Sequence, residues 1–337
     1  MNPNEIYYKK VMTSIGCALL IFLLLINLYG VLSAVLPLFF YQIPSWYVAY
    51  SILCGIIDAV LYLAAFLLPA LFLRLLLKGQ RLPVSPMRLG ICTTPYLPLI
   101  ILSGISICFA AAQLNAVMVE IFNYSEFSSQ VLWESMWDME PYEILLQFVT
   151  VSIVPGFCEE ILFRGAILTA CLPFGRSRAI IISSVLFALM HQNAEQIFYT
   201  FVAGVILGIV YERTGSIWSC ILLHVCNNFV SVIETAVFSK MGATDAGTLT
   251  VLLIECAIFI LGIISTGILI KRFFSQKQCL RDGVFGVEVS SSDGYATYPV
   301  SSSAAVRGFF RPTVIVFLCI CVFQILLLIF FSAVMFA

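Results

Sequence analysis

Charge is scarce in this chain. Asp, Glu, Lys and Arg make up 10% of its 337 residues, whereas a typical soluble domain carries about 25%. Hydrophobic residues make up 61% of the chain, and the mean hydropathy is +1.06. This composition excludes an ordinary soluble globular domain and predicts a protein that crosses a membrane several times.

Several patterns of soluble enzymes and metal proteins are also missing. The 12 cysteines lie mostly within apolar runs and include no Cys-x-x-Cys pair, which argues against a disulfide framework or a zinc ribbon. The sequence contains no Gly-x-Ser-x-Gly and no His-Glu-x-x-His. It therefore lacks the nucleophile elbow of many serine hydrolases and the helical motif of many zinc proteases.

Apolar segments of helical length fill most of the chain. A membrane-spanning helix needs about 20 residues, and nine candidates lie at approximately 11–40, 46–76, 96–122, 143–171, 179–195, 197–212, 216–239, 249–270 and 313–337. The fifth and sixth share a short break, which predicts either two tilted helices or one re-entrant hairpin. We expect an all-α, polytopic membrane bundle of about eight core transmembrane helices plus one C-terminal helix.

The basic residues predict an orientation. With the N-terminus inside and alternating crossings, Lys240 is the one basic residue outside and Arg164 lies within the membrane. The remaining 15 of the 17 basic residues then face the cytoplasm, as the positive-inside rule requires. We expect residues 1–272 to form the main domain and the serine-containing segment 273–311 to be a flexible cytoplasmic linker. The last helix, 313–337, is expected to lie outside the functional core, with its end outside the cell.

The few ionisable residues within apolar segments stand out, because such groups are costly in a bilayer and mark functional sites by default. Glu160 and Arg164 are four residues apart with the glutamate first, the favoured order for a helical ion pair. Glu159 lies about 100° around the helix and is left free by that pair. Each of the three could also belong to a structural cluster of buried charges.

Two histidines and an asparagine complete this set. His191 ends the run Phe187-Ala188-Leu189-Met190-His191, whereas His224 and Asn228 are four residues apart and share a helix face. Taken singly, these side chains are typical of hydrogen bonds between membrane helices. Their depths agree, however: Glu159 and His191 lie roughly 20 Å from the cytoplasmic ends of their helices, and His224 and Asn228 lie roughly 12 and 18 Å in. This agreement favours one shared site within the motif region 143–240.

The chemistry of such a site is limited. A carboxylate beside an imidazole can take a proton from water as a general base, and an imidazole and a carboxamide on one helix face can donate to an oxyanion. Together these groups suit the hydrolysis of an amide. Glutamate and histidine also bind zinc, so a zinc-dependent hydrolase stays open as an alternative. In the next helix, the spacing Gly204-x-x-x-Gly208 predicts close helix packing beside the site.

Three short motifs resemble those of the CPBP intramembrane proteases, which include type II CAAX prenyl endopeptidases and Abi-type proteins. They are Glu159-Glu160-x-x-x-Arg164, Phe187-x-x-x-His191 and His224-x-x-x-Asn228. The resemblance implies a glutamate-dependent endopeptidase with Glu159 as the base acting on water. By the same resemblance His191 helps to hold the water, His224 and Asn228 form the oxyanion site, and Glu160 and Arg164 organise Glu159.

The predicted partners are therefore the lipid bilayer and a membrane-associated protein or lipidated peptide substrate, with no nucleic acid. We expect no cofactor, zinc being the alternative, and a bacterial plasma membrane as the location. Two other functions compete with proteolysis. One is a non-catalytic binding or immunity protein that keeps the fold, and the other is a transporter with a proton relay, although the sequence shows no inverted repeats of the kind many transporters have. Asp58 and Glu255 receive no predicted role.

The predicted orientation can be tested by thiol labelling. Single cysteines placed at 240–247 and in 273–311, in a background without native cysteines, should differ in their reaction with an impermeant reagent on intact cells. The first group should label and the second should label only after lysis. Labelling of 273–311 from outside would contradict the orientation.

Overall fold

A computed structural model describes residues 2–40, 47–82, 85–122, 139–242, 244–275, 298 and 300–335. The described residues form helices and connecting segments without strands, which confirms the all-α class. The long helices are α1 (Pro3–Phe40), α2 (Tyr47–Gly79), α3 (Leu97–Phe122), α8 (Arg176–Met190), α9 (Ile197–Thr214), α10 (Ile217–Met241), α11 (Asp245–Ser275) and α14 (Pro312–Met335). A further long helical segment spans residues 141–174.

Eight of these helical segments are long and apolar enough to cross a membrane, so the chain is a polytopic integral membrane protein. Each of the nine predicted segments contains a helix within its described residues, but the fifth helix is too short to count as a span. Helix α8 has 15 residues, or about 22 Å at 1.5 Å per residue, against a hydrocarbon core of about 30 Å. It ends before His191, and Gln192 then turns the chain with a φ of 54°.

The α8 and α9 helices pack as an antiparallel hairpin. A Cβ atom added to Gly204 would lie 3.0 Å from the Cα of Ser184, and one added to Gly208 would lie 3.0 Å from the Cγ2 of Ile180. The close packing predicted from the glycine spacing is therefore confirmed. In the predicted orientation, the start of α8 and the end of α9 both lie on the cytoplasmic side. The predicted orientation of the other helices is therefore the same whether α8 and α9 cross the membrane or form a re-entrant hairpin.

The helical segment 141–174 changes its winding on both sides of the predicted glutamates. It consists of α5 (Pro141–Gln147), the π-helix η2 (Phe148–Ile153), α6 (Val154–Glu160), the π-helix η3 (Ile161–Leu168), α7 (Thr169–Cys171) and the 3-10 turn η4 (Leu172–Phe174). π-turns inside α-helices occur mostly at functional sites. Here Pro155, which has no N–H to donate, is the second residue after the first π-turn.

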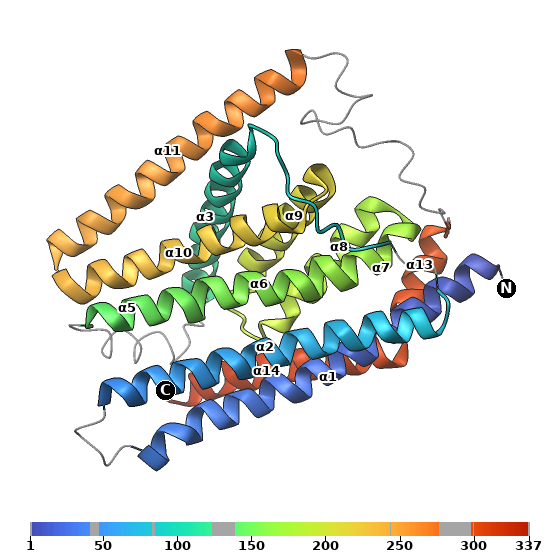
Figure 1. The fold of residues 1–337 in the computed structure, drawn as a ribbon, viewed down its shortest axis with the longest axis horizontal. Helices are drawn as coiled ribbons and strands as arrows, with labels where there is room; N and C mark the ends of the chain where they lie inside the picture. The colour runs from blue at the N-terminus through green and yellow to red at the C-terminus, as the bar shows by residue number, and fades with distance from the viewer. Residues whose placement is uncertain are drawn as a thin grey trace.

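The helices form layers (Figure 1). Helices α14, α1 and α2 lie together along one side of the molecule, with α1 in contact with both of the others, and the 141–174 segment lies between α2 and α10. On the other side of α10, α3 packs against α9 and α11. This arrangement places α6 in the interior of the bundle, where Glu159, Glu160 and Arg164 are buried.

Within the predicted linker 273–311, Ser302–Phe309 forms the helix α13. Ser301 caps this helix by accepting a hydrogen bond from the N–H of Ala304 at 3.3 Å. The N–H of Tyr298 donates to the carbonyl of Pro173 at 2.9 Å, and Arg311 Nε donates to Thr13 Oγ1 at 3.0 Å. The Arg311 contact joins the end of α13 to α1, and the Tyr298 contact joins the residues before α13 to η4. Residues 276–297 of the predicted linker lie outside the described part of the chain.

The C-terminal helix α14 packs closely along α1. Thr313 Oγ1 donates to the carbonyl of Thr13 at 3.1 Å, and Gln324 Nε2 donates to Asn27 Oδ1 at 2.9 Å. A Cβ atom on Gly16 would collide with the side chain of Thr313 and would lie 2.7 Å from the N of Val314. The absence of a side chain at Gly16 therefore allows the two helices to meet.

Gly16→Val should accordingly destabilise the bundle, by about 1–3 kcal/mol as expected for overpacking. The matched control is Gly30→Val on the same helix, because a Cβ there meets no atom within 4 Å. Thermal unfolding in detergent should show a lower midpoint for the Gly16 variant alone. Equal midpoints for the two variants would show that α14 does not pack on α1 at this point.

Candidate active site

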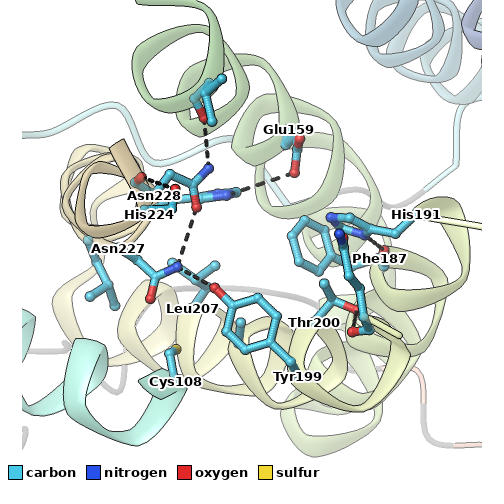
Figure 2. Close-up of a pocket in the computed structure, with 15 residues that line it drawn as sticks. Cys108, Glu159, Phe187, His191, Tyr199, Thr200, Leu207, His224, Asn227 and Asn228 are labelled. Carbon is cyan, nitrogen blue, oxygen red and sulfur yellow. Dashed lines mark hydrogen bonds and ion pairs between the residues drawn. The ribbon is translucent and has the colours of Figure 1, made fainter. Parts of the chain in front are cut away.

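A cavity of about 360 Å³ lies among α3, α6, α8, α9 and α10. Four of the six predicted site residues line it: Glu159, His191, His224 and Asn228. Figure 2 shows Glu159, His191, His224 and Asn228 around one open space, although they come from three separate parts of the chain. The other two, Glu160 and Arg164, lie directly behind the cavity wall and have no exposed surface.

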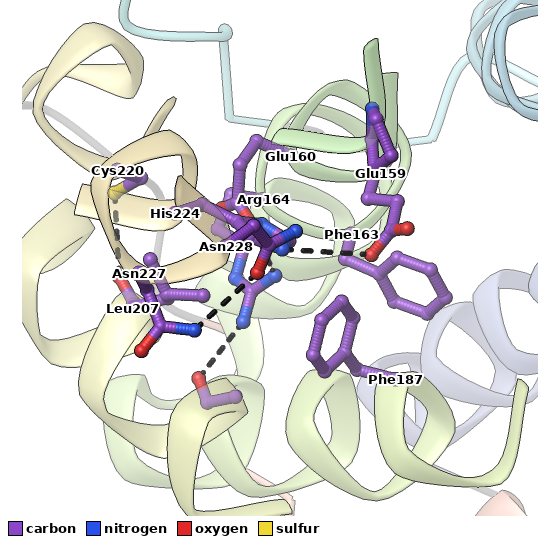
Figure 3. Close-up of polar contacts among 12 residues, drawn as sticks. Glu159, Glu160, Phe163, Arg164, Phe187, Leu207, Cys220, His224, Asn227 and Asn228 are labelled. Atoms are coloured by element: carbon purple, nitrogen blue, oxygen red, sulfur yellow. Dashed lines mark hydrogen bonds and ion pairs between the residues drawn. The ribbon is translucent and has the colours of Figure 1, made fainter. Parts of the chain in front are cut away.

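Arg164 ties three helical segments together (Figure 3). Its Nη1 donates to Glu160 Oε1 at 2.8 Å, the pairing predicted from the four-residue spacing. Its Nη2 donates to the carbonyl of Gly204 in α9 at 3.0 Å, and its Cζ lies 4.5 Å from the ring centroid of Phe187 in α8. The guanidinium thus neutralises a buried carboxylate and fixes the positions of α8 and α9 relative to α6.

Glu160 has a second partner that the spacing does not predict. His224 Nδ1 lies 2.8 Å from the same Oε1 atom that accepts from Arg164. A carboxylate oxygen accepts hydrogen bonds, so Nδ1 carries a proton and donates. This bond sets the orientation of the imidazole and directs Nε2 toward Glu159, whose Oε2 atom is 3.9 Å away.

The sequence suggested that Glu159 is free, but one of its carboxylate oxygens accepts a hydrogen bond. Tyr62 in α2 donates its hydroxyl to Glu159 Oε1 at 2.6 Å. The other oxygen, Oε2, is buried and makes no hydrogen bond to a described residue, while the residue as a whole is only 3% exposed and lines the cavity. Glu159 therefore offers one carboxylate oxygen for chemistry in the cavity.

His191 caps the C-terminal end of α8. Its Nδ1 lies 2.9 Å from the carbonyl of Phe187, and since a carbonyl can only accept, Nδ1 carries the proton. In the neutral ring Nε2 is then an acceptor. The ring also meets Phe187 edge to face, with centroids 5.0 Å apart. This tautomer suits a group that accepts a hydrogen bond from water.

Asn228 contacts the part of the 141–174 segment in which Pro155 removes a helical hydrogen bond. Proline cannot donate to the Val151 carbonyl four residues before it, and Asn228 Nδ2 donates to this carbonyl at 3.2 Å. Asn227 Nδ2 donates to Asn228 Oδ1 at 3.3 Å and is itself 2.5 Å from the hydroxyl of Tyr199. These contacts fix which side of the Asn228 amide carries the N–H groups, and its Nδ2 has two of them.

Sequence reasoning missed Tyr62, Tyr199 and Asn227. Asn227 could have been found, because it forms a pair of adjacent amides with Asn228 inside an apolar segment. The two tyrosines carry no such signal, since tyrosine is common in membrane helices. Asp58 and Glu255, left without a role, are not among the residues that line the cavity. Within the described ranges, no three His, Cys, Asp or Glu side chains are placed to hold a metal ion.

The comparisons with known proteins agree with the motifs. Residues 141–230 match the model of the Rce1-like family, the type II CAAX prenyl endopeptidases. The matched segment begins at α5, ends within α10 and contains all six predicted site residues. No curated protein and no solved structure matches the chain. The resemblance to the CPBP proteases is thus confirmed, and the part of the chain that carries the site is Rce1-like.

Arg164→Ala should reduce the yield of folded protein. It leaves the fully buried Glu160 without its cation and the Gly204 carbonyl without its donor, and breaking a buried ion pair costs about 3–5 kcal/mol. Arg213→Ala is the matched control, because Arg213 is exposed near the end of α9. Size-exclusion profiles and thermal unfolding in detergent should separate the two. A normal melting temperature for Arg164→Ala would rule out this structural role.

Proposed function

We propose that the protein is an intramembrane endopeptidase in which Glu159 activates a water molecule to cleave a peptide bond. The observation that carries this proposal is the shared cavity. One oxygen of Glu159 faces His224 there, and His191 and Asn228 also line the cavity. The Rce1-like match to this part of the chain supports a protease. The glutamate mechanism itself rests on the chemistry of these side chains.

In the first step, Glu159 Oε2 takes a proton from water, and the oxygen of that water attacks the carbonyl carbon of the peptide bond. His191 Nε2 holds the same water by accepting its second hydrogen. The carbonyl oxygen becomes an oxyanion, to which Asn228 Nδ2 and His224 Nε2 donate. Nε2 of His224 can donate only when the ring carries both protons, and Glu160 accepts the one on Nδ1.

In the second step, the tetrahedral intermediate collapses and the carbon–nitrogen bond breaks. Glu159 returns its proton to the departing amine, so that the carboxyl group acts first as a base and then as an acid. The products are a carboxylic acid, which keeps the second hydrogen of the water until it ionises into solvent, and a new amino terminus. Glu159 returns to its carboxylate form, and no covalent enzyme intermediate is formed.

A membrane-associated or lipidated peptide of the CAAX type is the proposed substrate class. The family match supports this class, and the cavity can receive a peptide because its wall combines apolar side chains with the hydrogen-bonding groups of Gln196, Tyr199, Asn227 and Ser231. We propose a bacterial plasma membrane as the location. The distribution of basic residues supports an orientation with the N-terminus in the cytoplasm and the C-terminus outside.

Glu159→Gln should lower the turnover of a reporter peptide by at least about 10², the usual contribution of general-base catalysis, while the protein stays folded. Glutamine keeps the shape and can still accept from Tyr62, but it cannot take the proton. Glu255→Gln is the matched control, because Glu255 lies in a membrane helix but does not line the cavity. Purified protein in detergent or liposomes gives the rates.

Two results would contradict the proposal. Full activity of Glu159→Gln would remove the carboxylate from the mechanism and favour a different hydrolytic site. Stoichiometric zinc in the purified protein, with inactivation by a chelator that zinc reverses, would favour the zinc-dependent alternative. Metal analysis of the same preparation therefore accompanies the rate measurements.

A further inference from the structure

The contact between Tyr62 and Glu159 joins the cavity to a helix outside the Rce1-like segment. Tyr62 belongs to α2, whereas the family match begins at residue 141. Its hydroxyl is 2.6 Å from Glu159 Oε1, which is short for a hydrogen bond between two oxygens and typical of one to a charged acceptor. The two residues are 97 positions apart in the chain.

The ring of Tyr62 is held in place by other aromatic side chains. Phe66, one turn further along α2, has its ring centroid 4.8 Å from that of Tyr62, and Tyr29 of α1 meets the ring edge to face at 5.6 Å. Phe66 in turn packs against Phe22 of α1 at 4.8 Å. The position of the hydroxyl is thus set by the packing between α1 and α2, and the hydroxyl is fixed from outside the cavity.

This hydrogen bond makes the two oxygens of Glu159 different. Oε1 accepts from Tyr62, whereas Oε2 has no hydrogen-bond donor among the described residues and lies 3.9 Å from His224 Nε2. A carboxylate held at one oxygen cannot rotate freely about its last bond. The second oxygen is therefore presented to the cavity in a defined direction.

We propose that Tyr62 is a positioning residue that fixes the Glu159 carboxylate and selects Oε2 as the atom that takes the proton from water. This inference rests on the proposed function, since it concerns the same carboxylate. It predicts that α2, and through it the packing of α1, contributes to the rate of the chemical step. Binding of the peptide should not depend on the hydroxyl, because Tyr62 does not line the cavity.

The test is Tyr62→Phe, which removes one oxygen atom and keeps the ring packed against Phe66 and Tyr29. A hydrogen bond to a charged group is worth enough to change a rate by about ten- to a hundredfold. We expect kcat for the reporter peptide to fall by that factor, with KM and the melting temperature unchanged. Tyr29→Phe is the matched control, because it removes a neighbouring hydroxyl that does not contact Glu159, and it should keep the full kcat.

The outcomes separate this inference from the proposed function. If Glu159→Gln is inactive and Tyr62→Phe has a kcat at or above that of the unmodified protein, the positioning role is overturned and the base assignment stands. A rise in KM with unchanged kcat, or an equal loss of kcat in Tyr29→Phe, also overturns it. If Glu159→Gln keeps full activity, the proposed function fails, whatever Tyr62→Phe does.

Discussion

The structure depends on one buried carboxylate. Glu160 has no exposed surface, and one of its oxygens accepts from both Arg164 and His224 at 2.8 Å. A carboxylate in this setting is stable only if it is paired and hydrogen-bonded, because an unpaired buried charge costs several kcal/mol. The two partners of that oxygen are Arg164, one turn further along the same helical segment, and His224 of α10. The requirement to satisfy this charge therefore brings α10 against the 141–174 segment with His224 in a fixed orientation.

The same constraint extends to the remaining walls of the cavity. Arg164, which neutralises Glu160, also binds the carbonyl of Gly204 and lies over Phe187, and Phe187 holds His191 through its own carbonyl. A structural ion pair thus positions a histidine that it does not touch. The structural and the candidate catalytic residues therefore belong to one network of contacts. Glu160 and Arg164 lie behind the cavity wall and support the groups that line the cavity.

A second interaction replaces a hydrogen bond that is missing from the helical segment 141–174. Pro155 leaves the Val151 carbonyl without its usual donor, and the π-turns before and after α6 shift the winding around the two glutamates. Asn228 supplies the donor to Val151. Asn228, which is proposed to stabilise the oxyanion, is therefore held by a carbonyl that Pro155 leaves without its helical donor, in the same helical segment as the proposed base Glu159. This link fixes the distance between the two halves of the site.

The sequence was sufficient for the all-α membrane architecture, and four of its six candidate site residues line one cavity. Apolar runs and charges predict the helices, and the buried ionisable side chains predict the cavity, because both follow from the cost of polar groups in lipid. The pairing of Glu160 with Arg164 follows from helix periodicity. The bond from His224 to Glu160 and the bond from Tyr62 to Glu159 do not, since each depends on how separate helices pack. The predicted segment 179–195 runs past the end of α8 at Met190 into the polar residues 192–195, because the turn at Gln192 requires a positive φ that no glycine signals.

The central claim is that the cavity holds a peptide bond between Glu159 and the donors of α10. The most direct measurement is an experimental structure of the Glu159→Gln protein with an uncleaved peptide bound. The account predicts that the scissile carbonyl carbon faces residue 159 and that its oxygen accepts from Asn228 and His224. A peptide bound outside this cavity, or one whose carbonyl oxygen points away from α10, would contradict it.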